Sequence, residues 1–246
     1  MSVPVIILLG GKGSRFSKID QQPKQLVNLN KNNLLTSIFL YYKKYNLNYF
    51  ILPLGHKKKF FLDFFNNKKN IKKYKFNILN NKNILIKKNH INLKLFNASE
   101  KSSKLSRIYK STKFFNSNYF MVTYGDGLAD IDFDKQINYF NKIKKKNLVT
   151  ICKIRSQYGH VKTSFNSGVL EFKEKPYLKV PINIGYYVFN KFDFLSLFNK
   201  KDELESEFLP KLVKKKSLFA YSHDGFFFNI DNKKDLEQVK NKYKKV

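Results

Sequence analysis

Short apolar runs alternate with amphipathic segments through the first 150 residues of the chain. Residues 3–9 form a continuous apolar run closed by glycine, which predicts a fully buried strand. From residue 33 apolar side chains recur at helical spacing, and residues 49–52 return to a buried-strand pattern. Because a strand, a helix and a strand in this order favour a parallel sheet with a right-handed crossover, the pattern predicts an α/β fold.

The alternation continues and then shortens. It predicts helices over residues 56–65, 102–115 and 133–143, and strands over residues 84–87, 93–96, 119–124 and 148–154. Shorter extended pieces follow at residues 161–164, 169–172 and 185–189, and two helices over residues 203–214 and 233–243 flank a strand over residues 226–230. No linker or repeat interrupts the pattern, so we expect a single domain over residues 1–246.

The composition supports a large core and raises the question of a polyanionic partner. With 42% hydrophobic residues the chain can bury a substantial core, but its formal net charge is +30. Arginine occurs only at Arg15, Arg107 and Arg155, so lysine carries nearly all of the positive charge, together with abundant Asn, Phe and Ile. This mixture is what AT-rich codons supply. It favours solvated surface lysines over a nucleic-acid-binding surface, which stays open as an alternative.

Cysteine content and hydropathy restrict the location of the protein. Cys152 is the only cysteine, which excludes an internal disulfide framework and a multi-cysteine metal site. The apolar run over residues 3–9 is too short to span a bilayer and leads into glycines where a signal peptide would need a cleavage site. We therefore expect a cytoplasmic protein with no membrane partner.

A glycine-rich loop follows the first predicted strand. In Gly10-Gly11-Lys12-Gly13-Ser14-Arg15 the glycines allow close approach of the backbone to a ligand, and free N–H groups there form an anion-binding nest. The dinucleotide fingerprint fits only in part, because Phe16 stands where its third glycine is required, and no P-loop Gly-Lys-Ser/Thr follows. Taken alone, the loop predicts either a phosphate-binding loop or an ordinary tight turn.

Further motifs decide between these two interpretations. The loop is followed by Pro23-Lys24-Gln25-Leu26, and the pair resembles the signature of the sugar-phosphate nucleotidyltransferases. The segment YGDGLADID over residues 124–132 resembles that of the glucose-1-phosphate cytidylyltransferases, the closest group. Glu174-Lys175-Pro176, the run over residues 182–190, Glu205-Ser206-Glu207 and a segment ending at Asp231 then follow in the expected order.

This resemblance implies a fold and a division of labour. The fold is an α/β, Rossmann-like, mostly parallel mixed sheet flanked by helices, of the GT-A-like nucleotidyltransferase type, with a small β-rich sugar-binding part in the C-terminal half. Within the single domain, residues 1–130 would form the nucleotide-binding half and residues 131–246 the sugar-phosphate-binding half.

The resemblance also implies a reaction. A sugar 1-phosphate, most closely glucose 1-phosphate, attacks the α-phosphorus of a nucleoside triphosphate, most closely CTP, and pyrophosphate leaves. The product is a nucleotide sugar for surface polysaccharide synthesis. Because the attacking phosphate oxygen is already anionic at neutral pH, the reaction needs no histidine base, and His56, His90, His160 and His223 are left out of catalysis.

Individual roles follow from the matching motifs. By resemblance, Arg15 and Lys24 are catalytic: Arg15 holds the leaving pyrophosphate and Lys24 bridges the attacking phosphate and the α-phosphate. Asp126 and Asp231 hold Mg²⁺, which prefers one or two carboxylates together with phosphate oxygens, although each could instead be a turn or capping residue. The nucleotide-binding positions are Leu9, Gly10, Gly11, Gly13, Ser14, Ser103 and Lys104, and the substrate-binding positions are Tyr124, Gly125, Glu174, Lys175, Asn183 and Gly185.

Some positions depart from the family pattern. Leu9 is large where the family has a small residue, so we expect it to crowd the base. Ser102 and Ser103 replace paired glycines ahead of a basic helix, which places cytosine specificity in question. Lys104 and Arg107 keep the basic character of that segment and are expected to meet the triphosphate.

Three alternatives stay open. The first is a nucleotidyltransferase for another base or another phosphorylated substrate. The second is a glycosyltransferase, for which Asp130-Ile131-Asp132 has the form of a metal motif, although its position favours helix capping. The third is a basic protein that binds nucleic acid or anionic surfaces. The expected partners of the favoured enzyme are a nucleoside triphosphate and a sugar 1-phosphate, and the resemblance suggests a homo-oligomer.

Overall fold

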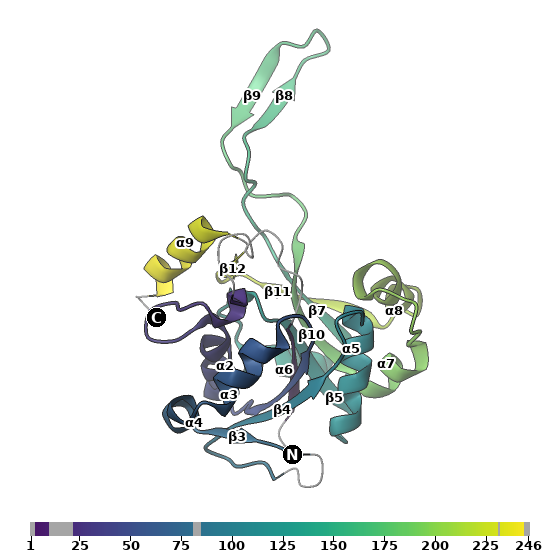
Figure 1. Cartoon of the computed structure of the whole chain (residues 1–246). Coiled ribbons are helices and arrows are strands. Elements are labelled where there is room, and N and C mark those ends of the chain that lie inside the picture. The colour runs from purple at the N-terminus through teal and green to yellow at the C-terminus, as the bar shows by residue number, and fades with distance from the viewer. Residues whose placement is uncertain (1–2, 10–21, 81–84, 231, 244–246) are drawn as a thin grey trace.

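An eight-stranded sheet forms the centre of the molecule in the computed structural model, which describes residues 3–9, 22–80, 85–230 and 232–243 (Figure 1). The strand order is β11-β7-β10-β5-β1-β2-β4-β3. The bounds are β1 (Pro4–Leu8), β2 (Tyr49–Leu54), β3 (Phe76–Ile78), β4 (Ile91–Asn97), β5 (Tyr119–Tyr124), β7 (Asn147–Cys152), β10 (Ile182–Asn190) and β11 (Leu218–His223). Both halves of the chain therefore contribute strands to one sheet.

Most neighbouring strands of this sheet are parallel. β1 pairs in parallel with β2 and β5, β4 pairs in parallel with β2 and β3, and β7 pairs in parallel with β11. Within the described strands of the sheet, β10 alone runs antiparallel to its neighbours, β5 and β7. The predicted Rossmann-like, mostly parallel mixed sheet is confirmed.

Helices cover both faces of the sheet, and the sheet divides the apolar core into two clusters. Along β1, Val5 and Ile7 belong to one apolar cluster and Ile6 to the other, because successive side chains of a strand point to opposite faces. The first cluster includes side chains of α2 (Leu34–Lys44), α3 (Lys58–Asn66), α6 (Phe133–Lys142) and α9 (Lys233–Tyr243). The second includes α5 (Lys104–Ser111), α7 (Lys191–Leu197) and α8 (Leu209–Lys214). Of the helices that the structure describes, none has the length and apolar character to cross a membrane.

Two predicted helices differ in detail from the observed ones. α5 begins at Lys104 and ends at Ser111, and a 3₁₀ turn over Thr112–Phe114 follows. The helix predicted over residues 203–214 is a π-helical turn, Leu204–Phe208, followed by α8. Sequence patterns also missed β3, β11, α7 and α4 (Lys68–Tyr74).

The strand predicted over residues 84–87 is wrong for its described part, because residues 85–87 pair with asparagine side chains. Asn77 Nδ2 donates to the Leu85 carbonyl at 2.8 Å, and the Lys87 N–H donates to Asn92 Oδ1 at 2.9 Å. Asn48 Nδ2 donates to the Lys87 carbonyl at 3.2 Å. These side chains satisfy backbone groups that a strand would pair with its neighbour.

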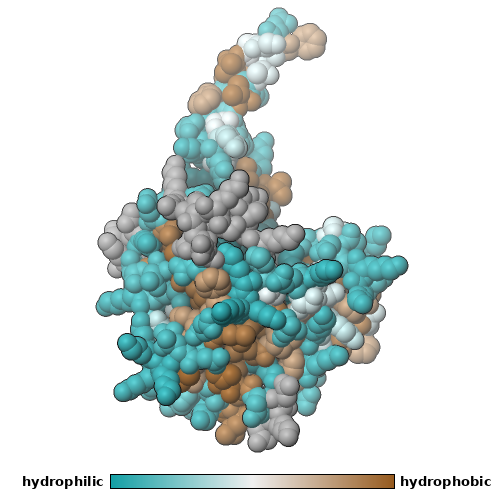
Figure 2. Space-filling model, viewed as in Figure 1, coloured by the Kyte–Doolittle hydropathy of each residue, from teal (hydrophilic) through white to brown (hydrophobic). Residues whose placement is uncertain are grey.

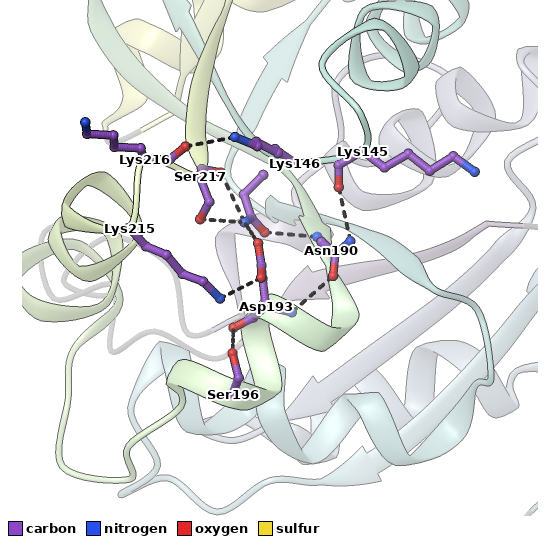
Figure 3. A network of polar contacts seen from close by, with 9 residues as sticks. Lys145, Lys146, Asn190, Asp193, Ser196, Lys215, Lys216 and Ser217 are labelled. Carbon is purple, nitrogen blue, oxygen red and sulfur yellow. Dashed lines mark hydrogen bonds and ion pairs between the residues drawn. The ribbon is translucent and has the colours of Figure 1, made fainter.

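A network of polar contacts around Asn190, Asp193 and Ser217 joins β7, α7 and β11 (Figure 3). Asn147, fully buried, donates from Nδ2 to Asp193 Oδ2 at 3.1 Å and to the Ser217 carbonyl at 3.2 Å. Its Oδ1 accepts the Asn190 N–H at 2.9 Å, where β10 passes into α7. Lys215 completes the network by pairing with Asp193 Oδ1 at 2.8 Å. Buried hydrogen bonds of this kind fix how the C-terminal elements attach to the sheet.

A two-stranded arm projects away from the sheet and its helices (Figure 1). β8 (His160–Thr163) and β9 (Val169–Lys173) pair antiparallel, and every residue of both strands is exposed. Val161 lies opposite Phe172, so apolar side chains share one face of the arm, and Figure 2 shows apolar surface along it. The base is held by backbone hydrogen bonds of 2.8 Å from Ser156 to Pro176 and from Leu178 to Ile154.

Candidate active site

The parallel strands β1 and β5 end side by side, and the predicted motifs follow their carboxyl ends. In the register of β1 and β5, Leu8 lies opposite Tyr124. The glycine loop follows β1 and the Gly125-Asp126-Gly127 turn follows β5. In open α/β sheets, ligands bind outside the carboxyl ends of the strands. The predicted positions Gly10, Gly11, Gly13, Ser14 and Arg15 lie outside the described residues.

Lys24 and Asp126 form an ion pair near the carboxyl ends of these two strands. Lys24 opens the 3₁₀ turn η1 (Lys24–Leu26), and its Nζ atom lies 2.9 Å from Asp126 Oδ2. Their side chains are 12% and 29% exposed, so both are partly shielded and still reach the surface. The structure thus brings together a predicted catalytic lysine and a predicted metal ligand from two motifs far apart in sequence.

A small second sheet brings the C-terminal segment against Asp126. β6 (Gly127–Ala129) pairs antiparallel with β12 (Phe227–Asn229), and Gly127 lies opposite Asn229. The Ile230 N–H donates to the Asp126 carbonyl at 3.0 Å. Asp231, the other predicted metal ligand, lies outside the described residues and follows Ile230 directly in the chain. The described residues include no group of three or more His, Cys, Asp or Glu side chains that could hold a metal by themselves.

Gly125 packs against the end of β1. Its N–H donates to the Leu8 carbonyl at 3.3 Å, and a Cβ atom at this position would lie 2.6 Å from Leu9 Cδ2. Leu9 is fully buried in the core. The structure therefore places the Leu9 side chain against Gly125, and the absence of a side chain at Gly125 makes room for it.

The segment that begins α5 is tied to the backbone around it. Ser103 caps the helix, since its hydroxyl accepts the Ser106 N–H at 3.2 Å. The guanidinium of Arg107 is buried and donates to the carbonyls of Leu9 at 2.6 Å and Ser102 at 3.0 Å, with longer bonds to Ser99 and Glu100. The expectation that Arg107 meets the triphosphate is wrong, because its donors are directed at backbone carbonyls.

A chain of hydrogen bonds joins three predicted substrate-binding residues. The Tyr124 hydroxyl donates to the Glu205 carboxylate and lies 3.2 Å from the Tyr187 hydroxyl. Asn183 Nδ2 donates to the Tyr187 hydroxyl at 2.7 Å, and Asn183 Oδ1 accepts the Gly185 N–H at 2.9 Å. Burial raises the pKa of Tyr124, and the neighbouring Tyr187 and Glu205 raise it further, so the phenol stays protonated and able to donate.

Gly185 allows β10 to pass close to Tyr124. Its φ is +77°, in the left-handed region that favours glycine, and the register of β10 against β7 shifts between Asn183 and Tyr187. A Cβ atom at Gly185 would lie 2.4 Å from Tyr124 Cδ2. The predicted position therefore has a clear local role, which is to accommodate the Tyr124 ring.

Glu174 and Lys175 lie on the arm just after β9. Their side chains are 61% and 58% exposed and pair with each other at 3.4 Å. Lys175 has a φ of +46°. Their predicted role in substrate binding stays a prediction.

Two residues of the site were not predicted. Tyr187 links Tyr124 to Asn183, and Glu205 accepts hydrogen bonds from both Tyr124 and Lys104. Both lie in segments that match the family signature, residues 182–190 and Glu205-Ser206-Glu207. That signature could have singled them out, but it carried no indication of what they contact.

Comparison with known proteins agrees with the family resemblance found in the sequence motifs. The sequence model of the nucleotidyl transferase family matches residues 4–245. The chain is 30% identical to a probable glucose-1-phosphate cytidylyltransferase of Bacillus subtilis, over 95% of this chain and 93% of that one. It is 26% identical to the glucose-1-phosphate cytidylyltransferase of Salmonella typhi, over 94% and 91% of the two chains.

A solved structure shares the fold. HddC from Yersinia pseudotuberculosis superposes with a TM-score of 0.69 at 20% sequence identity, covering 98% of this chain and 99% of that one, and it has also been solved with GMP-PN. At this identity the likeness concerns the fold. The family match over nearly the whole sequence shows that this chain belongs to the nucleotidyl transferase family.

Proposed function

We propose that this protein joins a nucleoside triphosphate to a sugar 1-phosphate with release of pyrophosphate, and that CTP and glucose 1-phosphate are its substrates. Membership of the nucleotidyl transferase family and the two cytidylyltransferase relatives support this proposal. The structural observation that carries it is the Lys24–Asp126 pair at the carboxyl ends of β1 and β5. The product would be a nucleotide sugar of the kind used in surface polysaccharide synthesis.

The reaction is an exchange of one phosphorus–oxygen bond for another. An anionic oxygen of the sugar 1-phosphate forms a bond to the α-phosphorus, and the bond from that phosphorus to the bridging oxygen of pyrophosphate breaks. Catalysis of such transfers is mostly positioning and neutralisation of charge on oxygen. We propose that the Lys24 ammonium holds the attacking phosphate and the α-phosphate, and that Arg15 holds the leaving pyrophosphate.

The residues near Lys24 fit a magnesium ion. Mg²⁺ takes carboxylate oxygens together with phosphate oxygens and water, and the partly exposed Asp126 carboxylate supplies such an oxygen. The backbone bond from Ile230 to Asp126 supports Asp231 as the second ligand, because it brings the chain to Asp126 just before that residue. When bound, Mg²⁺ would neutralise the triphosphate. Asp126 would then orient both the ion and the Lys24 ammonium.

The base that is read depends on the segment ahead of α5. The Ser102 hydroxyl donates to the Ala98 carbonyl and accepts from Lys110 Nζ at 2.9 Å, while the Ser103 hydroxyl caps α5. Both hydroxyls are thus engaged within the protein. This supports the interpretation that the serines are a tolerated variation within a cytidylyltransferase, and a change of base is the alternative.

The test is pyrophosphate release from CTP, dTTP, UTP, GTP and ATP, with and without Mg²⁺, against a panel of sugar 1-phosphates. Mg²⁺-dependent release with CTP and glucose 1-phosphate is the expected result. Release with a different pair would keep the reaction and overturn the assigned substrates. Absence of release with every pair, in protein that is folded by circular dichroism, would overturn the proposed function.

A further inference from the structure

Glu205 lies on an unusual helical turn that is anchored at both ends. The π-helical turn Leu204–Phe208 closes with a hydrogen bond of 3.1 Å from the Phe208 N–H to the Glu203 carbonyl. Leu204 and Phe208 are fully buried in the second core cluster. π-helical turns are rare, and those that do occur are often found at functional sites. The two buried anchors fix where the backbone presents Glu205.

A single carboxylate oxygen of Glu205 contacts residues from two other elements. Lys104 Nζ, at the start of α5, forms an ion pair with Glu205 Oε1. The Tyr124 hydroxyl, at the end of β5, donates to the same Oε1 atom. Lys104 Nζ also lies 5.1 Å from the centre of the Tyr124 ring, a cation–π distance. Glu205 thereby joins a predicted nucleotide-binding residue to a predicted substrate-binding residue.

The hydrogen bonds behind Tyr124 run in one direction and end at Glu205. Asn183 is oriented by accepting the Gly185 N–H, so its Nδ2 donates to Tyr187. The Tyr187 hydroxyl can then donate to Tyr124, which in turn donates to Glu205. A carboxylate can only accept at this end, and it therefore sets the polarity of the whole chain.

The exposure of the Lys104–Glu205 pair argues against a mainly stabilising role. The two side chains are 44% and 37% exposed. Ion pairs at this exposure contribute little to stability. The same pair still restricts the positions of a flexible lysine and of a phenol, which matters where substrate groups must be aligned.

We propose that Glu205 is a positioning residue that orients Lys104 toward the nucleoside triphosphate and Tyr124 toward the sugar phosphate. The inference rests on the proposed function and adds to it a residue that touches neither substrate. It makes two separable claims, since the bond to Tyr124 needs only an acceptor whereas the bond to Lys104 needs a negative charge.

The substitution Glu205→Gln separates these claims. The amide oxygen still accepts from Tyr124, but the charge that holds Lys104 is lost. We expect the KM for the nucleotide to rise about tenfold, with the KM for the sugar 1-phosphate and kcat each within about twofold. Glu205→Ala should raise both KM values. Glu207→Gln, on the same turn with an exposed side chain, is the matched control and should change neither.

A double-mutant cycle with Lys104→Met tests whether Glu205 acts through Lys104. If it does, Glu205→Gln changes the nucleotide KM by less than about twofold once Lys104 is absent. Calorimetric binding of the nucleotide without sugar phosphate gives a second readout that does not depend on turnover. The inference would be overturned if the nucleotide KM of the double variant rose by the product of the two single-variant factors, or if Glu205→Gln raised both KM values in parallel. In either case, turnover by the wild-type protein would still uphold the proposed function. Wild-type protein without turnover and without nucleotide binding would overturn both.

Discussion

The Nη1 atom of Arg107 lies 2.6 Å from the carbonyl oxygen of Leu9, the residue that precedes the glycine loop. The same guanidinium holds the carbonyl of Ser102, ahead of α5, at 3.0 Å. One buried cation therefore links the residue after β1 to the helix that carries Lys104. This link depends on a planar side chain with several donors.

Replacing Arg107 with alanine should destabilise the protein, because the backbone carbonyls that accept hydrogen bonds from the buried guanidinium would lose their charged donor. We expect Arg107→Ala to lower the free energy of unfolding by about 2 to 4 kcal/mol. Lys113→Ala, at an exposed position just beyond α5, should change it by less than about 0.5 kcal/mol. Urea unfolding of both variants measures this. Equal effects would show that the buried hydrogen bonds of Arg107 contribute nothing.

Asp126→Asn should abolish turnover without unfolding the protein. The amide keeps the size of the side chain but removes the charge that pairs with Lys24 and that we propose for Mg²⁺. We expect kcat/KM to fall by at least about a hundredfold, with an unchanged circular dichroism spectrum. Asp134→Asn, an exposed aspartate on α6, is the control. Retained turnover in Asp126→Asn would remove Asp126 from the reaction.

Arg15→Ala should slow the reaction without a matching change in fold. By resemblance Arg15 stabilises the leaving pyrophosphate, and loss of a preorganised charge stabiliser costs about a hundredfold or more in rate. Arg155→Ala is the matched comparison and should keep the wild-type rate, since the Arg155 guanidinium lies 4.9 Å from the centre of the Tyr177 ring near the base of the arm. A rate for Arg15→Ala within about threefold of wild type would contradict the proposed role.

Gly185→Ala should be strongly destabilising. Alanine at a φ of +77° is strained, and its Cβ would overlap the Tyr124 ring, which together should cost about 2 to 4 kcal/mol of unfolding free energy. Gly168→Ala in the arm is the matched control, since its nearest neighbour is a serine hydroxyl that can move. Thermal unfolding compares the two. A Gly185→Ala protein as stable as the control would show that β10 can shift away from Tyr124.

The raised pKa of Tyr49 should make the free energy of unfolding fall at alkaline pH. Burial raises its pKa to about 12, and its hydroxyl donates to the Phe114 carbonyl at 2.7 Å. The unfolded chain, with a tyrosine pKa of about 10, loses its proton first, so this stabilisation is complete below pH 10 and is lost as the pH rises toward 12.

Comparison with Tyr49→Phe isolates that contribution. The variant should be less stable than wild type at pH 8 by about 1 kcal/mol, and the difference should shrink or reverse at pH 11. Tyr158→Phe, at an exposed position of the arm, should show no such trend. Urea unfolding at both pH values measures it, and a difference that stays constant with pH would contradict the assignment to Tyr49.

The central sheet could be predicted because its strands are buried on both faces. Val5, Ile6 and Ile7 are fully buried, and continuous apolar runs of this kind are typical of parallel strands. The resemblance assigned Lys24 and Asp126 to one site, but it did not predict that the two side chains form an ion pair.

Other features depend on contacts that no local pattern contains. The apolar residues Leu85 and Ile86 are typical of a strand, but the asparagine side chains of Asn77 on β3 and Asn92 on β4 hold this segment instead. Glu205 becomes significant only because its turn meets both α5 and β5. Arg107 follows Lys104 in the same helix, yet its neighbours direct it inward.

The distribution of arginine is informative in this chain, because only three of its 48 Lys and Arg residues are arginine. Arg107 donates to several carbonyls from its planar guanidinium, which a lysine ammonium could not do from the same position. The guanidinium carbon of Arg155 lies 4.9 Å from the centre of the Tyr177 ring. Arg15 is the third arginine of the chain, and the role that the resemblance implies for it, holding pyrophosphate oxygens, also uses a planar fork of donors.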